Sequence, residues 1–207
     1  DQGAVLAAGR FGKLAIANGT AGQSTSDWLQ ADLRGFALGT GGELTLGLTR
    51  AVIDSDSANG VLPSATTRLG TSLFSEFGFS KVTVNAVDGI DIVADTAMLV
   101  QQKNLVVDPL TVAQQAGGRE LASFAAVQVL PDAQRSAASV ALAVRGGGQD
   151  PEAGLNLREG ASIVTDPRGE VTLSAVNGLA IDGRISAPGG RIGMTLNGPI
   201  DLSASDL

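Results

Sequence analysis

Residues 82–92 read VTVNAVDGIDI, and residues 171–181 read VTLSAVNGLAI. The two stretches share six identities, and every large apolar position of the first is apolar in the second. A looser third copy over residues 192–202 begins 21 positions after the start of the second. Short alternating strands that recur at a period of about 20 residues are typical of a β-solenoid, because each repeat buries its apolar face only against its neighbours. The sequence therefore predicts an all-β fold that serves as a scaffold.

The same alternation continues outside these copies. Residues 42–46, GELTL, match residues 169–173, GEVTL, and the apolar pair of residues 155–157 returns at residues 179–181. We expect eight such rungs, which at about 4.8 Å per strand make a rod roughly 38 Å long. In the last repeats the following residues should point into one continuous core: Val171, Leu173, Leu179, Ile181, Ile192, Met194, Ile200 and Leu202.

An antiparallel arrangement is the alternative at two points. Asn177-Gly178 and Asn197-Gly198, each flanked by alternating residues, are also a strong signal for a β-hairpin turn. Hairpins do not require successive segments to carry apolar residues at the same offsets, whereas stacked parallel strands do. The repeated offsets therefore favour parallel stacking.

Small and β-branched side chains dominate the composition. The chain has 207 residues with 28 Gly, 43% hydrophobic residues, one Trp, and no Tyr, His or Cys. Such side chains fill narrow interiors between closely spaced strands, so we expect a thin core. We interpret the aromatic cluster of Phe74, Phe77 and Phe79 as core packing or as shielding of a rung edge, rather than as an anchor for a partner.

Charge and hydropathy argue against two classes of partner. The net charge is −7 and the Lys and Arg residues are scattered singly, so the footprint of a nucleic-acid-binding protein is missing. No apolar run approaches the roughly 18 to 20 residues that a membrane helix requires. The chain begins at Asp1 without a Met or a leader sequence, so we interpret residues 1–207 as a single segment of a larger protein.

Two insertions interrupt the repeats, at residues 54–67 and 94–134. The first is rich in turn-forming polar residues and should loop outward. Its polar side chains make it the candidate ligand-binding loop, with these candidate residues: Asp54, Asp56, Asn59 and Thr66. In the second insertion, residues 105–107 resemble a strand, Asp108-Pro109 starts a turn or short helix, and residues 121–129 are ambiguous between helix and strand.

The sequence offers little for catalysis. It contains neither His nor Cys, and glycosidic chemistry needs carboxyl groups about 5 to 9.5 Å apart. Asp91 and Asp201 occupy equivalent outward positions with Ala180 between them. With about four rungs from Asp91 to Ala180 and one more to Asp201, the two acids would lie about 24 Å apart. Residues 54–60 have one residue too many before the Gly for a calcium loop. We therefore expect no enzyme activity, no cofactor and no metal site.

The repeats resemble those of a known family. Residues 169–175, GEVTLSA, and residues 179–192, LAIDGRISAPGGRI, are similar to the repeats of filamentous-haemagglutinin-family exoproteins, which alternate strands with Gly and with an ISAPGG step. Residues 73–107 and 121–142 also resemble a region of the large outer-membrane members of that family. The resemblance covers roughly residues 41–202.

This resemblance implies a right-handed parallel β-helix with loop and short-helix insertions. It also implies two-partner secretion through a dedicated outer-membrane pore, localisation on the bacterial surface, and attachment to a glycan or protein on a host or neighbouring cell. We therefore expect a structural and adhesive segment of a secreted exoprotein. The alternatives are a carbohydrate-active β-helix enzyme, which would need acids on adjacent rungs, and an assembly module whose open ends join copies or neighbouring domains.

Overall fold

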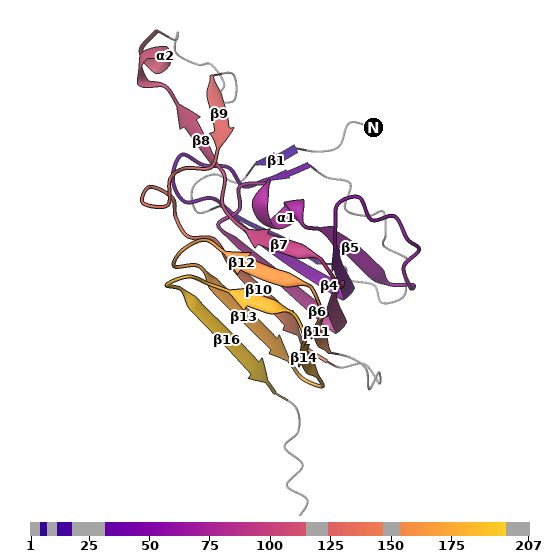
Figure 1. The fold of residues 1–207 in the computed structure, drawn as a ribbon. Coiled ribbons are helices and arrows are strands. Elements are labelled where there is room, and N and C mark those ends of the chain that lie inside the picture. Colours follow the sequence, from indigo (N-terminus) through magenta and orange to yellow (C-terminus); the bar gives the residue numbers. More distant parts are fainter. Residues whose placement is uncertain (1–4, 8–11, 18–31, 115–123, 147–153, 198–207) are drawn as a thin grey trace, which may run out of the picture.

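The structure is a computed structural model and describes residues 5–7, 12–17, 32–114, 124–146 and 154–197 (Figure 1). These described residues are mostly strands, with two short helices among them. The predicted all-β fold class is therefore confirmed.

The largest element of the described chain is a nine-stranded sheet in which neighbouring strands run parallel (Figure 1). Its first half contains β2 (Lys13–Ala17), β10 (Ser139–Val144), β13 (Glu170–Ala175) and β16 (Arg191–Leu196). Its second half contains β5 (Thr66–Gly70), β11 (Leu155–Leu157) and β14 (Leu179–Ile181). Both halves share the long, bent strands β4 (Glu43–Asp54) and β6 (Lys81–Ile92). We call the two parts the first and second half-sheets.

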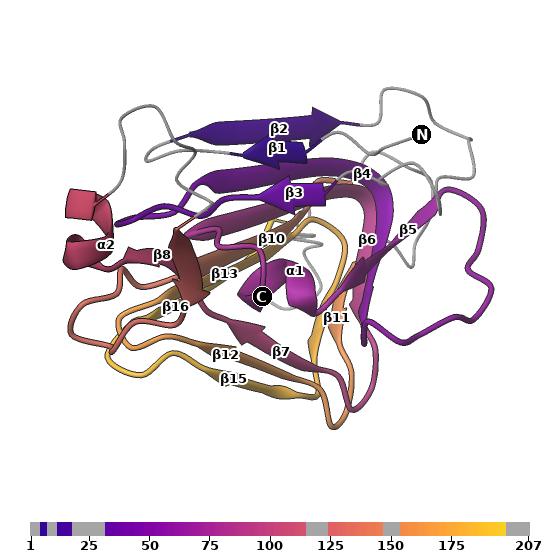
Figure 2. The same cartoon turned by 90° about the horizontal axis from the view of Figure 1, so that it is seen from above.

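A second parallel sheet lies on the third side of the core. It contains β7 (Ala97–Val100), β12 (Ser162–Thr165) and β15 (Arg184–Ser186). Seen from above, this sheet and the two half-sheets surround the core (Figure 2). The chain visits the three sides in turn, as in β10, β11 and β12. Separately, β1 (Val5–Ala7) and β3 (Asp32–Arg34) form a parallel pair.

Strand pairing keeps the offsets that the sequence predicts. In the first half-sheet Val140 pairs with Val82 on one side and with Val171 on the other, and Val171 pairs with Ile192. In the second half-sheet β11 and β14 pair at the predicted positions. Each inward side chain therefore lies next to its equivalent on the neighbouring strand, which confirms the predicted parallel register.

The Asn177-Gly178 step is a corner between half-sheets. The flanking strands β13 and β14 lie in different half-sheets and do not pair with each other. The Leu155 N–H donates to the Gly178 carbonyl at 2.9 Å, and a Cβ added at Gly154 would lie 2.8 Å from that carbonyl oxygen. Gly154 therefore permits the close approach of successive backbones. The hairpin alternative is wrong here, and Gly198 of the second proposed hairpin lies outside the described residues.

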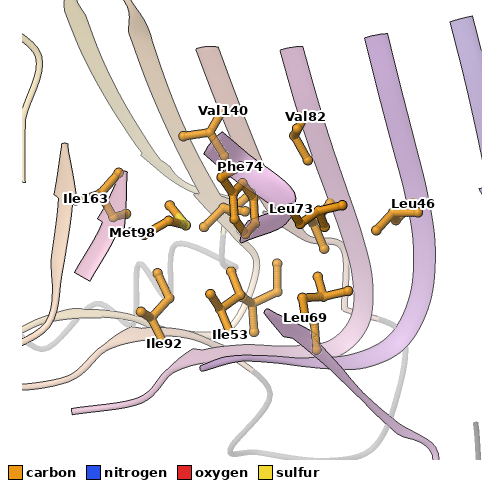
Figure 3. Packing of buried hydrophobic residues seen from close by; sticks show 14 of the residues in the cluster. Leu46, Ile53, Leu69, Leu73, Phe74, Val82, Ile92, Met98, Val140 and Ile163 are labelled. Atoms are coloured by element: carbon orange, nitrogen blue, oxygen red, sulfur yellow. The ribbon is translucent and has the colours of Figure 1, made fainter. Parts of the chain in front are cut away.

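Aliphatic side chains and one short helix fill the interior. The helix α1 (Ser72–Ser75) buries Leu73 and Phe74, which lie among side chains from the surrounding strands (Figure 3). Phe79 is also buried, and Phe77 packs against the same cluster. The prediction that these aromatic residues serve core packing is confirmed.

Burial decreases toward the last described strand. The predicted inward residues of β13 are fully buried, and those of β14 pack against the core while partly exposed. Ile192 and Met194 in β16 keep the same register but are 44% and 47% exposed, because β16 stands at the end of the strand order. Ile200 and Leu202 lie outside the described residues.

Both predicted insertions have different boundaries in the structure. Thr66 and Thr67 belong to β5, so the first insertion projects only over residues 55–65, which we call the loop. The range predicted for the second includes β7, which is part of the second parallel sheet. The segment between β7 and β10, residues 101–138, extends beyond the predicted end at residue 134, and we call it the hairpin insertion. It contains β8 (Asn104–Val107), α2 (Pro109–Gln114) and β9 (Ala125–Gln128). The strand predicted at residues 105–107 is confirmed. Of the turn or short helix expected at Asp108-Pro109, the structure has the helix, and the ambiguous stretch contains the strand β9.

The number of rungs expected between Asp91 and Ala180 is wrong. Asp91 pairs with Asn156 and Asn156 with Ala180, so two strand steps separate Asp91 from Ala180, not four. The first half-sheet contains six described strands: β2, β4, β6, β10, β13 and β16. The expected number of rungs between Asp91 and Ala180 is too large because the hairpin insertion lengthens the chain between them. Its antiparallel strands β8 and β9 add no strand to the nine-stranded sheet. Asp201 lies outside the described residues.

A buried ion pair anchors the hairpin insertion. The Arg135 guanidinium donates to the Asp166 carboxylate through Nη2 at 2.5 Å and through Nε at 2.9 Å. Both side chains are only 4% exposed. Arg135 also bonds to the Leu130 carbonyl and to Asp132, and Gln101 donates to Asp166 at 3.2 Å. The hydrogen bond that Arg135 donates to Asp166 raises the pKa of Arg135 above its usual value, although burial opposes this shift.

Candidate functional site

The four candidate ligand residues lie at one edge of the second half-sheet, but in different environments. Asp54 ends β4, Thr66 begins β5, and Asp56 and Asn59 lie in the loop between these strands. Asp56 and Asn59 are exposed, whereas Thr66 is buried. The sequence therefore predicts the region that these four residues share, but the structure shows that they differ in exposure.

Asp56 holds the loop to the start of α1. Its carboxylate accepts hydrogen bonds from the Ser72 hydroxyl at 2.6 Å, from the Ser72 N–H at 3.1 Å and from the Thr71 hydroxyl at 3.0 Å. A carboxylate in this position satisfies a backbone donor at a helix start, as capping residues do. These bonds give Asp56 a structural role in the described part of the chain.

The Arg68 side chain holds the loop through its backbone carbonyls. Its guanidinium donates to the Ala58 carbonyl at 3.1 Å and to the Gly60 carbonyl at 2.9 Å. Its Nε lies 3.9 Å from the Asp54 carboxylate. Because β4 and β5 are parallel, with Thr66 opposite Arg50 and Gly70 opposite Asp54, the loop runs back along the length of this strand pair. The loop is thus positioned over the sheet.

A groove of about 560 Å³ lies beside this loop on the outer surface of the second half-sheet. One row of outward residues, Val52, Asp91 and Asn156, lines it, and these residues pair with one another on successive strands. Pro63 of the loop and Thr66 of β5 line it from the loop side. The volume is in the range of ligand pockets, which is roughly 300 to 1,000 Å³.

Two arginines line the same groove. Arg50 lies on β4 next to Thr66, and Arg158 follows directly after β11. Arg158 donates through Nε to the Asp91 carboxylate at 2.7 Å, and this bond raises the pKa of Arg158 above its usual value. The Arg158 side chain is 54% exposed, so a ligand can reach it. The groove lining thus contains two guanidinium groups and one carboxylate.

Thr66 is the least satisfied polar residue of the groove. It is 1% exposed, and its hydroxyl has no hydrogen-bond partner among the residues that the structure describes. Thr66 also lines a hollow of about 530 Å³ under the loop, together with Asp56 and Asn59. Buried hydroxyl groups are generally paired, because leaving one unpaired costs about 1–3 kcal/mol.

Sequence reasoning missed most of the groove. Of the four candidate residues only Thr66 lines it, while Arg50, Asn156 and Arg158 were not singled out. The sequence predicts that Asp91 faces outward, but it does not place Arg158 beside it. The signal for Arg50 and Arg158 was their position at outward offsets of the alternation, but the pairing of β5 with β4 is what brings the loop over them.

Comparison of the chain with protein-family models, with curated proteins and with solved structures found no match. In the described ranges no helix is both long enough and apolar enough to cross a membrane. Those ranges also contain no cluster of three or more His, Cys, Asp or Glu side chains suited to hold a metal ion. The site is therefore characterised by its own geometry alone.

Proposed function

We propose that the chain is a segment of a right-handed parallel β-helix that acts as a structural and adhesive part of a secreted bacterial exoprotein. The observation that carries this proposal is the shared register of β6, β10, β13 and β16, in which equivalent residues pair in parallel from strand to strand. Stacked repeats of this kind make elongated scaffolds with extended binding surfaces. The resemblance to filamentous-haemagglutinin-family exoproteins suggests the surface location and secretion through an outer-membrane pore.

Adhesion requires a recognition surface on the scaffold. The groove and the loop that overhangs it supply a polar, charged surface on the outer side of the second half-sheet. Loops positioned by a rigid scaffold are common sites of recognition. We infer that the partner is a glycan or protein on a neighbouring or host cell, and that it contacts this side.

A bead-attachment assay tests the adhesive role. Beads coated with the 207-residue chain should attach to cultured epithelial cells or to a glycan array, and a parallel polysaccharide-hydrolysis assay should release no product. Beads coated with an acidic protein of similar charge are the control. Absence of attachment to all cells and glycans would overturn the adhesive proposal, and release of product would favour a carbohydrate-active enzyme instead.

The exposed edge of β16 supports a second candidate, an assembly module. Ile192, Met194 and Leu196 are 44%, 47% and 58% exposed, although their pairing partners in β13 are fully buried. An apolar strand edge readily pairs with another strand, and a Lys on such an edge opposes this pairing.

If the edge joins copies or neighbouring domains, Met194→Lys should lower the association seen by analytical ultracentrifugation, whereas Ala180→Lys on the outer surface should not. A chain that is monomeric at all concentrations would reject self-association.

A further inference from the structure

One side of β16 is an open strand edge. Among the described strands β16 pairs with β13 and stands at the end of the sheet (Figure 1). The Arg191 N–H donates to the Gly169 carbonyl, on the β13 side, at 3.0 Å. The N–H groups of successive residues in a strand point alternately to its two sides, so those of residues 192, 194 and 196 face the open side. This side therefore offers the donors and acceptors for one more parallel strand.

The inward side chains of β16 also lack a cover. Ile192, Met194 and Leu196 are 44%, 47% and 58% exposed, whereas their partners in β13 are fully buried. Strand edges that stay unpaired are usually blocked by charges, Pro or a bulge. The six residues of β16, RIGMTL, contain one charge, at Arg191. The edge thus has the properties of a strand that a partner covers.

A row of mostly charged residues crosses the outer surface of the first half-sheet where its strands begin. From β2 to β16 the row consists of Lys13, Glu43, Lys81, Ser139, Glu170 and Arg191. No two like charges are neighbours in it. Lys13 lies 3.0 Å from the Glu43 carboxylate, and Arg191 lies 3.8 Å from the Glu170 carboxylate.

This row determines which charge fits beside Arg191 on the open side. Opposite charges across neighbouring strands stabilise the pairing, and like charges oppose it. Glu43 shows that one charged residue of the row can have an opposite charge on each side, since Lys13 and Lys81 flank it. The Arg191 side chain is 80% exposed, so a second acid can reach it. An acidic residue therefore continues the alternation.

The same rule argues against a second copy of the chain as the partner. A copy that stacked through β2 in the same register would place its Lys13 beside Arg191, with like charges opposed. The two strands of the sheet that begin with an acid are β4 and β13, and each is already paired on both sides. A neighbouring domain is thus the better source of the strand.

We propose that the open edge of β16 binds, in parallel, a β-strand of a neighbouring domain that begins with Glu or Asp and has apolar residues at its second, fourth and sixth positions. The acid lies beside Arg191, and the apolar residues cover Ile192, Met194 and Leu196. The sequence EVTLSA of β13 is an example of this pattern. This inference rests on the assembly role proposed above, because it names the partner of that edge.

Binding of two capped heptapeptides to the 207-residue chain tests the charge preference. One has the sequence of residues 169–175, GEVTLSA, and the other has Lys in place of Glu. Backbone NMR shifts measure the affinities, and slower hydrogen exchange of the Met194 N–H locates the bound strand. We expect the Glu peptide to bind at least about threefold more tightly, and the difference to shrink at high salt. Equal affinities would overturn the acidic preference, and absence of binding by either peptide would overturn the docking edge.

Variants with reversed charge locate the contact. Arg191→Glu should reverse the preference, so that the Lys peptide binds more tightly than the Glu peptide. Arg184→Glu makes the same charge change at the first residue of β15, in the other sheet, and should leave the preference as it is in the native chain. Met194→Lys should weaken binding of both peptides. A preference for the Glu peptide that persists in Arg191→Glu would show that the row of charges does not select the partner.

The assembly role and this inference can fail separately. If the chain self-associates through Met194 but the two peptides bind equally, the assembly role stands and the acidic preference is wrong. If the Glu peptide is preferred while the chain stays monomeric, the edge accepts a strand of another domain and self-association is rejected. If the chain stays monomeric and neither peptide binds, both proposals fail.

Discussion

The two insertions are both fixed to the stacked strands, but the side chains that anchor them differ in their exposure to water. The hairpin insertion is held through Arg135 and Asp166, whose side chains are each 4% exposed. The loop is held through Asp56, which is exposed, and through Arg68, whose side chain is 23% exposed. One anchor is thus withdrawn from water and the other remains in contact with it.

This difference teaches how the polar residues of an insertion should be interpreted. A buried ion pair loses much if one partner is removed, because the other charge stays buried without compensation. Polar contacts near the surface contribute less, because water replaces them. The abundance of polar residues in the loop is typical of a ligand site, yet Asp56 and Arg68 use their side chains to hold the loop itself.

The largest effect is expected when the buried anchor is broken. Asp166→Ala leaves the Arg135 guanidinium buried without its main partner and should lower the free energy of unfolding by about 3–5 kcal/mol. Chemical denaturation of the purified variant measures this change. The double variant Arg135→Met with Asp166→Leu replaces the pair by apolar side chains and should recover most of the loss. A double variant as unstable as the single one would show that the ion pair is not what makes this anchor sensitive.

A smaller effect is expected at the base of the loop. Arg68→Ala removes two hydrogen bonds to loop carbonyls and should cost about 1–2 kcal/mol, less than a buried charged pair because the side chain is partly exposed. Residues 55–65 should become more sensitive to limited proteolysis, while cleavage within the nine-stranded sheet stays slow. Arg184→Ala, at the exposed first residue of β15, is the matched control. Equal protease resistance of Arg68→Ala and the native chain would contradict the anchoring role of Arg68.

The contact of Asp56 with α1 should matter less still. Asp56→Ala removes the acceptor for the Ser72 N–H and should cost about 1 kcal/mol, as for other capping residues. Asp56→Asn keeps one carbonyl acceptor and should retain part of this stability. Thermal unfolding of the three proteins should therefore give midpoints in the order native, Asp56→Asn, Asp56→Ala. An inverted order would mean that the carboxylate does not stabilise α1.

The smallest effect is expected at Asn59, which is exposed at the tip of the loop. Asn59→Ala should change the free energy of unfolding by no more than about 0.5 kcal/mol. It should also leave attachment of coated beads to cells or glycans unchanged, because Asn59 does not line the groove. A large loss of bead attachment in Asn59→Ala would place the recognition site in the loop and not in the groove.

Several features of the fold could be predicted from the sequence. The match of residues 82–92 with residues 171–181 indicated parallel strands in register, because stacked strands place equivalent side chains next to one another. The Asn-Gly steps were open to two interpretations, since the same dipeptide favours hairpin turns. Only the arrangement of β13 and β14 in different half-sheets decided for a corner.

The candidate site was less predictable. Composition indicated that residues 54–67 reach the surface, but Thr66 became buried because β5 pairs with β4. The expected four rungs between Asp91 and Ala180 became two strand steps, because the hairpin insertion leaves the stack without adding strands to it. The repeat period predicts the number of rungs from the number of residues alone, whereas a rung forms only where a strand pairs with its neighbours.

The sequence by itself determined the alternation, the parallel register and the aliphatic character of the core, because each depends on which residue types recur at short, fixed offsets. The tertiary structure alone decided where the chain leaves the stack and which charged groups meet. Arg135 lies 31 positions from Asp166 in the sequence, and Arg158 lies 67 positions from Asp91. No local pattern encodes such contacts, because they arise only when the strands have stacked and the insertions have folded back onto them.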